Sequence, residues 1–302
     1  MTGPNAAALS RAAVRQRLSD YAMLAKPRVV LMVLITTYVG FYLGSRDGVD
    51  LLRLLHTLLG TALAASGTMA LNQYMERERD ARMRRTRQRP LPDGRVRPAE
   101  ALAVGLTMLA TGLAYLAVAT GALCTLLTGA IAASYLLLYT PLKGVTSLCS
   151  VVGAIPGALP PVAGWAAAAG SLSVAPWVLF AIMFLWQIPH TLAIGALYRD
   201  DYADAGIRVL PVIDFSGERT GTHAITNCLA LLPVALMPTL VGLAGAVYFA
   251  SALVLGVAFL AAAVRLKRTG TPASARRLLM VSLVYLPVLL AVMALDKGPL
   301  TP

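Results

Sequence analysis

The sequence predicts an all-α integral membrane protein built as a bundle of nine transmembrane helices. Three observations predict it. Of the 302 residues, 58% are hydrophobic and only 13% are charged, which is typical of multi-spanning membrane proteins. The hydrophobic residues fall into separate runs, each long enough to cross about 30 Å of hydrocarbon at about 1.5 Å per residue. The charged residues gather between these runs.

The nine runs lie, in chain order, at about 28–45, 51–71, 99–118, 121–139, 148–168, 174–197, 224–244, 246–265 and 277–295. Several are close to the minimum length, and the links near Gly121 and Gly245 are short, so eight helices remain an alternative. We expect residues 1–26 to form a polar cytoplasmic tail and residues 27–302 to form a single membrane domain. The tail lacks a short apolar core with a cleavage site, so a cleaved signal peptide is not expected.

Basic residues set the expected orientation. The net charge of +12 would suggest a nucleic-acid partner in a soluble protein. In a membrane protein, the loops that carry the positive charge must be identified before a partner is inferred from it. With nine spans, every Lys and Arg except Arg46, Arg53 and Lys297 falls on one side. Because cytoplasmic loops are enriched in Lys and Arg, we expect no nucleic acid. We expect instead a multi-pass protein of the cell (inner) membrane, with the N-terminus cytoplasmic and the C-terminus outside. The mitochondrial inner membrane is the less favoured location.

The stretch LNQYMERERDARMRRTRQRPLP, residues 71–92, ends the second run with a dense group of charges. Asn72, Glu76 and Asp80 recur every four residues, so on a helix they share one face at steps of about 6 Å. Their oxygens are the ligands that hard cations prefer, at a spacing suited to cations bridging a diphosphate. The arginines nearby suit phosphate or carboxylate binding. A basic loop at the membrane edge explains those arginines equally well, but it does not explain the acids in register.

A second acidic group, Asp200, Asp201 and Asp204, follows the sixth run. Nine spans place both groups at inner helix ends, where they could face each other across the mouth of the bundle. Alternatively, these acids pair with Arg199 and Arg208 at the surface.

The fifth run is rich in proline and glycine, which predicts either a bent helix beside a pocket or close packing through small residues. The isolated cysteines, Cys124, Cys149 and Cys228, are expected to be buried free thiols. The three histidines form no zinc-binding pattern.

The first motif resembles that of the intramembrane prenyltransferases of the UbiA superfamily. The residues that carry this resemblance are Asn72, Glu76, Asp80, Arg85, Thr86, Arg89, Pro90, Leu91 and Pro92. Members of that family have nine transmembrane helices around a central cavity, and use two acidic motifs with Mg²⁺ to hold an isoprenyl diphosphate. The resemblance therefore implies the same UbiA-like fold here.

Four further stretches are similar to the branch of this superfamily whose members farnesylate heme B. They are AKPRVVLMVLITT at 25–37, YTPLKGVTSLCSVVGAIPGALPPVAGW at 139–165, LWQIPH at 185–190 and YRDDYADAGIRVLPV at 198–212. Departures from the branch pattern are Glu76 for a common Asp, Gly144 for a basic residue, Cys149 for Asn, Thr191 for Phe, and Arg208-Val209 for Pro-Met. They weaken inferences about those positions rather than about the reaction.

The resemblance implies a Mg²⁺-dependent prenyltransferase that joins the farnesyl group of farnesyl diphosphate to a vinyl group of heme B. Water is added, and heme O and diphosphate are formed, in the heme A/O synthesis that serves terminal oxidases. The expected partners are both substrates, membrane lipid, and a heme A synthase or oxidase assembly proteins. Two alternatives remain: an aromatic prenyltransferase making a quinone or pigment precursor, and a non-enzymatic heme carrier or transporter.

The resemblance also implies roles for individual residues. Metal binding falls to Asn72, Glu76, Asp80, Asp200, Asp201 and Asp204, with Asp201 preferred in the second motif. Catalytic roles fall to Asn72, Glu76, Asp80, Asp201 and Lys143. Substrate binding falls to Arg77, Arg85, Arg89, Asp200, Tyr139 and His190.

Two of these assignments have alternatives. His190, at membrane depth, is either an axial ligand of heme iron or hydrogen-bonded to a neighbour. Tyr139, like Tyr74, Tyr135 and Trp186, either shields a cation with its ring or belongs to an aromatic interface belt. The belt is the favoured interpretation for Tyr139.

Overall fold

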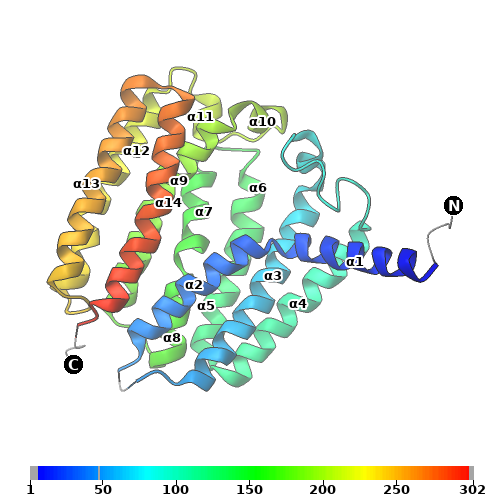
Figure 1. Ribbon diagram of the computed structural model, residues 1–302, viewed down its shortest axis with the longest axis horizontal. Helices are drawn as coiled ribbons and strands as arrows, with labels where there is room; N and C mark the ends of the chain where they lie inside the picture. The colour runs from blue at the N-terminus through cyan, green and yellow to red at the C-terminus, as the bar shows by residue number, and fades with distance from the viewer. Residues whose placement is uncertain (1–5, 47, 299–302) are drawn as a thin grey trace.

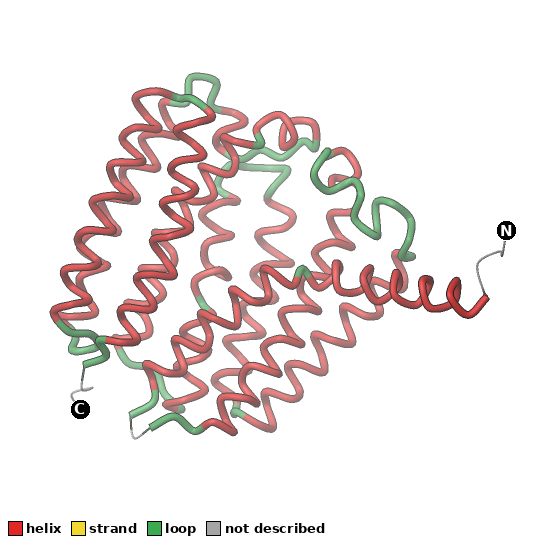
Figure 2. Tube along the Cα trace, in the orientation of Figure 1, coloured by secondary structure: helices red, strands yellow, loops and turns green. Residues whose placement is uncertain are grey.

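The computed structural model describes residues 6–46 and 48–298, which are mostly helical and contain no β-strand. Figures 1 and 2 show the helices side by side, joined mostly by short loops. In chain order they are α1 (Ala6–Ala25), α2 (Pro27–Gly44), α3 (Leu51–Arg82), α4 (Pro98–Ala119), α5 (Ala122–Ala133), η1 (Ser134–Tyr139), α6 (Thr140–Leu142), α7 (Cys149–Ala158), α8 (Pro160–Ala169), α9 (Val174–Leu197), α10 (Arg199–Asp204), α11 (Leu210–Ile213), α12 (Glu218–Leu240), α13 (Ala246–Thr269) and α14 (Pro272–Leu295).

Nine spans in the described residues are long and apolar enough to cross a membrane, which confirms the expected count over eight. Seven of the spans are single long helices, namely α2, α3, α4, α9, α12, α13 and α14. The remaining two are composite: α5, η1 and α6 form one, and α7 and α8 form the other. The protein is therefore an integral membrane protein of the multi-pass type.

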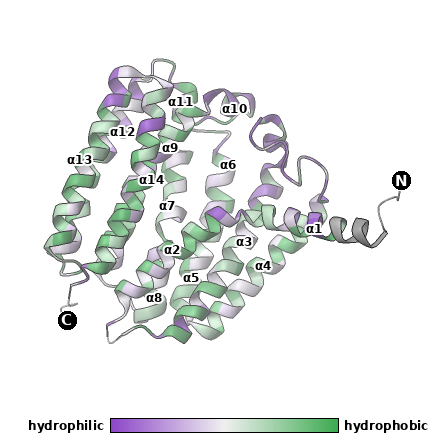
Figure 3. Ribbon diagram, viewed as in Figure 1, coloured by the Kyte–Doolittle hydropathy of each residue, from purple (hydrophilic) through white to green (hydrophobic). Residues whose placement is uncertain are grey.

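Hydrophilic residues gather at one end of the bundle (Figure 3). This end holds α10, the loop after α3 and the first turns of α12. The sides of the spans are mostly hydrophobic in the same view. The charged connections thus lie together as nine alternating spans require, and we refer to this side as the polar end.

The expected tail at 1–26 is helical from Ala6 to Ala25 in the described residues. In Figure 1, α1 projects sideways from the polar half of the bundle instead of running along it. Asp20 accepts a hydrogen bond from Arg95, and Tyr21 donates one to Glu100 at the start of α4. Polar contacts thus hold α1 to the rim of the bundle.

The span expected at 224–244 is shifted, and its predicted bounds are wrong at both ends. Helix α12 begins at Glu218 because Asp214 accepts hydrogen bonds from the backbone and hydroxyl of Thr220, which satisfies its first turn. It ends at Leu240, where the carbonyl of Pro238 accepts the amide of Leu243 in a turn. The apolar pattern marked the span but not these local hydrogen bonds.

The fifth span bears out both interpretations of its proline and glycine content. It breaks between Ala158 and Pro160, so that α7 and α8 are separate helices. Residues of α7 line the cavity described below. In α8, a β-carbon at Gly164 would overlap the carbonyl of Thr37 in α2, so the two backbones touch there. The span therefore borders the cavity, through α7 and through Pro160 and Ala163 of α8, and its second half also packs closely against α2.

The fourth span contains a π-helical segment, η1, that the sequence did not indicate. The backbone N–H of Thr140 donates to the carbonyl of Tyr135, five residues back, and the Thr140 hydroxyl donates to the same carbonyl at 2.8 Å. Such wide turns occur mostly as short insertions in α-helices, frequently at functional sites. Here the wide turn places both Tyr135 and Tyr139 in the wall of the cavity.

A charged cavity at the polar end

A cavity of about 400 Å³ lies between the spans. Its charged part is lined by Lys26, Glu76, Arg79, Asp80, Arg85, Arg89 and Lys143. Its remaining wall is mainly apolar and includes Val33, Ala64, Met69, Ile131 and Ala163. A cavity with this division suits a ligand that has an anionic head and an apolar tail.

The predicted register on α3 is confirmed, since the helix continues through Arg82. Asn72, Glu76 and Asp80 are all buried, with exposed fractions of 0%, 7% and 5%. Glu76 and Asp80 line the cavity. Buried carboxylates need compensating charges, and the structure supplies one to each.

Lys143 compensates Glu76, and Arg89 compensates Asp80. The Nζ of Lys143 lies 2.7 Å from Oε1 and 3.0 Å from Oε2 of Glu76. The Nη1 of Arg89 lies 2.7 Å from Oδ2 of Asp80. Burial works against the charge of Lys143, yet the tyrosines around it and the Glu76 carboxylate raise its pKa above the usual value. The lysine therefore stays charged.

The amide of Asn72 is oriented by three partners. Its Nδ2 donates to Oε2 of Glu76 at 2.9 Å and to the hydroxyl of Thr140 at 3.1 Å. Its Oδ1 accepts a 2.7 Å hydrogen bond from Nζ of Lys26. Both amide hydrogens are thus used, and the oxygen faces the lysine.

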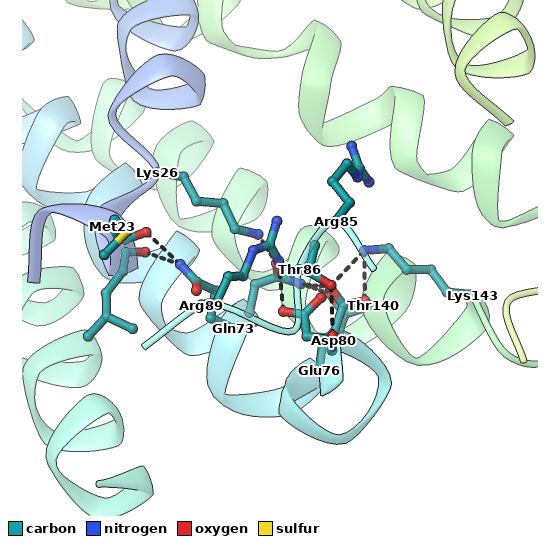
Figure 4. Close-up of polar contacts among 12 residues, drawn as sticks. Met23, Lys26, Gln73, Glu76, Asp80, Arg85, Thr86, Arg89, Thr140 and Lys143 are labelled. Carbon is teal, nitrogen blue, oxygen red and sulfur yellow. Dashed lines mark hydrogen bonds and ion pairs between the residues drawn. The ribbon is translucent and has the colours of Figure 1, made fainter. Parts of the chain in front are cut away.

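Sequence reasoning missed Lys26, which Figure 4 shows reaching toward the side of α3 that carries Glu76 and Asp80. Its backbone, with φ of 49°, makes the left-handed turn between α1 and α2. Burial, together with the neighbouring charges of Arg89 and Lys143, lowers its pKa to about 7. The only sequence signal is a lysine directly before the proline that opens the first span, a pattern that also marks an ordinary membrane flank.

The loop after α3 brings two arginines to the cavity, whereas one expected arginine on α3 itself lies outside it. Arg85 and Arg89 line the cavity. Arg77 instead lies over the ring of Tyr74 at 4.9 Å and 3.4 Å from Glu78, away from the lining residues. Arg79, to which sequence reasoning assigned no role of its own, lines the cavity and donates a hydrogen bond to the carbonyl of Thr140 at 3.3 Å.

The second acidic group meets the first motif through one residue. The backbone N–H of Arg85 donates to Oδ2 of Asp201 at 3.3 Å, and the Arg85 guanidinium lies 5.0 Å from the ring centre of Tyr198. None of the three acids lines the cavity; Asp200 and Asp204 are exposed, and Asp201 is half-buried. In the described residues, none of the three acids forms an ion pair with Arg199 or Arg208. The structure therefore contradicts the alternative in which these acids pair at the surface.

The donor chemistry of the charged end fits a divalent cation held jointly with a phosphate ligand. Within the described residues, no group of three His, Cys, Asp or Glu side chains could hold a metal by itself. Mg²⁺ sites typically use one or two carboxylates, with the rest of the coordination from water and substrate phosphates. Glu76, Asp80 and the half-buried Asp201 supply carboxylates of that kind.

His190 is hydrogen-bonded to a neighbouring side chain, as the second of its two interpretations expects, and it does not line the cavity. Its Nδ1 lies 2.8 Å from Oγ of Ser282, and its ring stacks on Trp186 at 4.8 Å. Because the Ser282 hydroxyl donates to the carbonyl of Leu279 at 2.6 Å, it accepts from His190, so Nδ1 carries the hydrogen. Nε2 is then the unprotonated nitrogen.

Tyr139 lines the cavity, so it does not belong to an interface belt, which was the favoured interpretation. The Nζ of Lys143 lies 4.4 Å from its ring centre. Tyr135 lies beside it, with ring centres 5.1 Å apart. The three cysteines are free and buried, as expected.

Comparison with known proteins adds three findings. A family model described as the UbiA prenyltransferase family matches residues 33–286. The chain is 45% identical over 289 residues to a protein of Solibacter usitatus (strain Ellin6076) named protoheme IX farnesyltransferase, covering 93% of this chain and 99% of that protein.

Two solved structures share the fold at low sequence identity. A digeranylgeranylglyceryl phosphate synthase superposes with a TM-score of 0.79 at 16% identity, covering 93% of this chain and 98% of the other. A UbiA homolog from Archaeoglobus fulgidus bound to GPP and Mg²⁺ gives a TM-score of 0.63 at 18% identity, covering 91% of this chain and 99% of the other.

Proposed function

The chain belongs to the UbiA prenyltransferase family, and on that basis we propose that it farnesylates heme B. The farnesyl group of farnesyl diphosphate joins a vinyl group of heme B, water is added, and heme O and diphosphate are formed. The observation that carries this proposal is the 45% identity, over almost the whole of both chains, to a protein named protoheme IX farnesyltransferase. The charged and apolar halves of the cavity support it, because they match a prenyl diphosphate.

The charged end binds the diphosphate in this proposal. Arg85, Arg89, Lys26 and Lys143 surround it with positive charge from three segments of the chain. Arginine binds phosphate oxygens through paired N–H groups, and a lysine acts as a compact charge. As the allylic C–O bond breaks, these groups stabilise the negative charge that develops on the leaving diphosphate.

Mg²⁺ is the proposed cofactor, held by Asn72, Glu76 and Asp80 together with Asp201. Asp200 and Asp204 are weaker candidates because they are exposed and lack the contact that Asp201 makes with the backbone of Arg85. When bound, the metal neutralises charge on the leaving group. The Mg²⁺ in the Archaeoglobus fulgidus relative supports a divalent cation here.

The apolar part of the cavity holds the farnesyl chain and keeps bulk water from the carbon that becomes cationic. Tyr135 and Tyr139 lie between the charged and apolar parts, and their ring faces suit an allylic cation. Arg77 lies outside the cavity, where it could meet only a group at the rim, such as a heme propionate.

We also propose that the protein lies in the cell (inner) membrane with its polar end cytoplasmic, because nearly all basic residues lie on that side. A heme A synthase or an oxidase assembly protein remains the expected protein partner.

The test uses the purified full chain in lipid nanodiscs with heme B, farnesyl diphosphate and Mg²⁺. Mass spectrometry should detect heme O, and diphosphate release should require both substrates. Release with 4-hydroxybenzoate in place of heme B would favour an aromatic prenyltransferase. Heme binding without diphosphate release would favour a carrier.

A further inference from the structure

Gln187 is a polar side chain at an unusual depth. It lies on α9, ten residues before Leu197 and so about 15 Å from the polar end of that helix. It lines the cavity and is half-buried. An amide at this depth costs free energy unless it is hydrogen-bonded, so its place in an otherwise largely apolar wall needs a physical reason.

The contacts of Gln187 orient its amide. Its Nε2 donates to the carbonyl of Met183 at 3.0 Å and lies 3.5 Å from the carbonyl of Ala154 in α7. Carbonyl oxygens only accept hydrogen bonds, so the NH₂ group must be on their side. The Oε1 atom therefore points the other way, and no described residue donates a hydrogen bond to it.

Helix α7 leaves room for this oxygen at Gly157. A β-carbon at that position would overlap Oε1 of Gln187. Gly157 lines the cavity too, so the amide oxygen lies against a bare backbone at the cavity wall. The side chain is thus tied down by its donors while its acceptor stays free.

Two hydroxyl side chains line the same cavity on these helices. Thr191 follows Gln187 by one turn of α9 and donates to the carbonyl of Ile188 at 3.0 Å, so its oxygen can still accept. Ser150 lies on α7. A buried water needs two to four polar partners, and Gln187 and Thr191, one turn apart on α9, are of the kind that provide them.

We propose that Oε1 of Gln187 holds the water molecule that is added to the substrate, an inference that rests on the proposed function. The new bond joins farnesyl C1 to the terminal vinyl carbon of heme B while the C1–O bond breaks, and the diphosphate leaves with the electron pair. The positive charge then lies on the vinyl carbon attached to the porphyrin. The water oxygen bonds to that carbon, and its extra proton passes to the released diphosphate.

The need for a fixed water follows from the competing reaction. The same cation can lose a proton from the adjacent CH₂ group, which gives an alkene lighter than heme O by one water. Because the apolar wall keeps bulk water away, the outcome depends on a water already in place. Oε1 of Gln187 accepts a hydrogen bond from one O–H group of the water, which leaves a lone pair of the water oxygen for the cation.

The test is the product ratio of Gln187→Met in nanodiscs with heme B, farnesyl diphosphate and Mg²⁺. The variant should still farnesylate heme B, but the ratio of alkene to hydroxylated product should rise about tenfold or more, as expected for losing one hydrogen bond at the branch point. With ¹⁸O-labelled water, the label per farnesylated heme should fall accordingly. Asn227→Leu, which removes an amide that also donates to the carbonyl four residues back but does not line the cavity, should keep the wild-type ratio.

An unchanged ratio in Gln187→Met overturns the inference. Loss of both products overturns it as well, because the role is confined to the step after C–C bond formation. If Gln187→Met does not accumulate in membranes, Gly157→Ala carries the same test, since the added β-carbon displaces the amide. A wild-type protein that makes no farnesylated heme would refute the proposed function instead.

Discussion

Replacing Lys143 by methionine removes the closest cation from a buried carboxylate. The two side chains of the Lys143–Glu76 pair are 13% and 8% exposed, and their closest atoms are 2.7 Å apart. Breaking a buried pair from one side costs about 3–5 kcal/mol, because the other charge stays buried without its partner. Glu76 keeps its hydrogen bond from Asn72. We therefore expect the free energy of unfolding to fall by about 3 kcal/mol, at the lower end of that range.

The double variant Lys143→Met/Glu76→Gln separates the ion pair from other effects. Removing the uncompensated charge should restore part of the lost stability, with a coupling free energy of about 2 kcal/mol. Diphosphate release should stay low in both, because the proposed phosphate contact of Lys143 is absent from both. Denaturant titration of the detergent-solubilised protein, followed by tryptophan fluorescence, measures stability on the same samples.

A surface pair provides the matched control. Lys267 and Glu218 are 3.5 Å apart, with 35% and 68% of their side chains exposed. Lys267→Met should change the free energy of unfolding by less than about 1 kcal/mol. If the losses in the Lys143 and Glu76 variants simply add to within about 0.5 kcal/mol, the two groups do not form the buried pair described above.

Three further predictions follow from single sites. Asp80→Asn should lower heme O formation by about 100-fold or more at an unchanged protein level, since it removes a carboxylate that is proposed to hold Mg²⁺ at the diphosphate end. Heme extracts analysed by mass spectrometry, with immunoblots of membranes, would show this, and near-normal heme O would exclude Asp80 from the metal site. Gly164→Val should destabilise the protein by more than about 2 kcal/mol, because its β-carbon would overlap the carbonyl of Thr37, whereas Gly129→Ala, with its nearest neighbouring atom 4.0 Å away, should leave thermal unfolding unchanged. Despite burial, hydrogen bonds lower the pKa of Asp214 below its usual value. The stability that Asp214 contributes is therefore complete above the ordinary carboxyl pKa of about 3.9 and is lost as pH falls through the lowered value. Asp214→Asn should flatten the pH dependence of thermal stability in that range, and an unchanged pH profile would contradict this role of Asp214.

The spans and the acidic stripe were open to prediction because both depend on periodicity. Apolar runs of sufficient length specify membrane helices almost regardless of tertiary contacts. The spacing of Asn72, Glu76 and Asp80 specifies one helix face whatever lies opposite. The structure bears out both.

The partners across the cavity could not be predicted in the same way. Lys26 reaches Asn72 only because a left-handed turn joins α1 to α2, and Thr140 reaches it only because η1 widens the fourth span. Neither backbone feature has a period in the sequence. Asp201 differs from Asp200 and Asp204 through a contact with the backbone of Arg85, which depends on how two loops fold.

The contact between α1 and α3 ties a peripheral helix to the centre of the protein. Gln73, the residue after Asn72, donates 2.8 Å hydrogen bonds to the carbonyls of Met23 and Leu24 at the end of α1 (Figure 4). Lys26 follows two residues after Leu24, so helix and lysine cannot shift independently. Swinging α1 away from the bundle would withdraw a positive charge from the head of the bound prenyl donor, and substrate affinity would then report the position of a helix outside the membrane-spanning bundle.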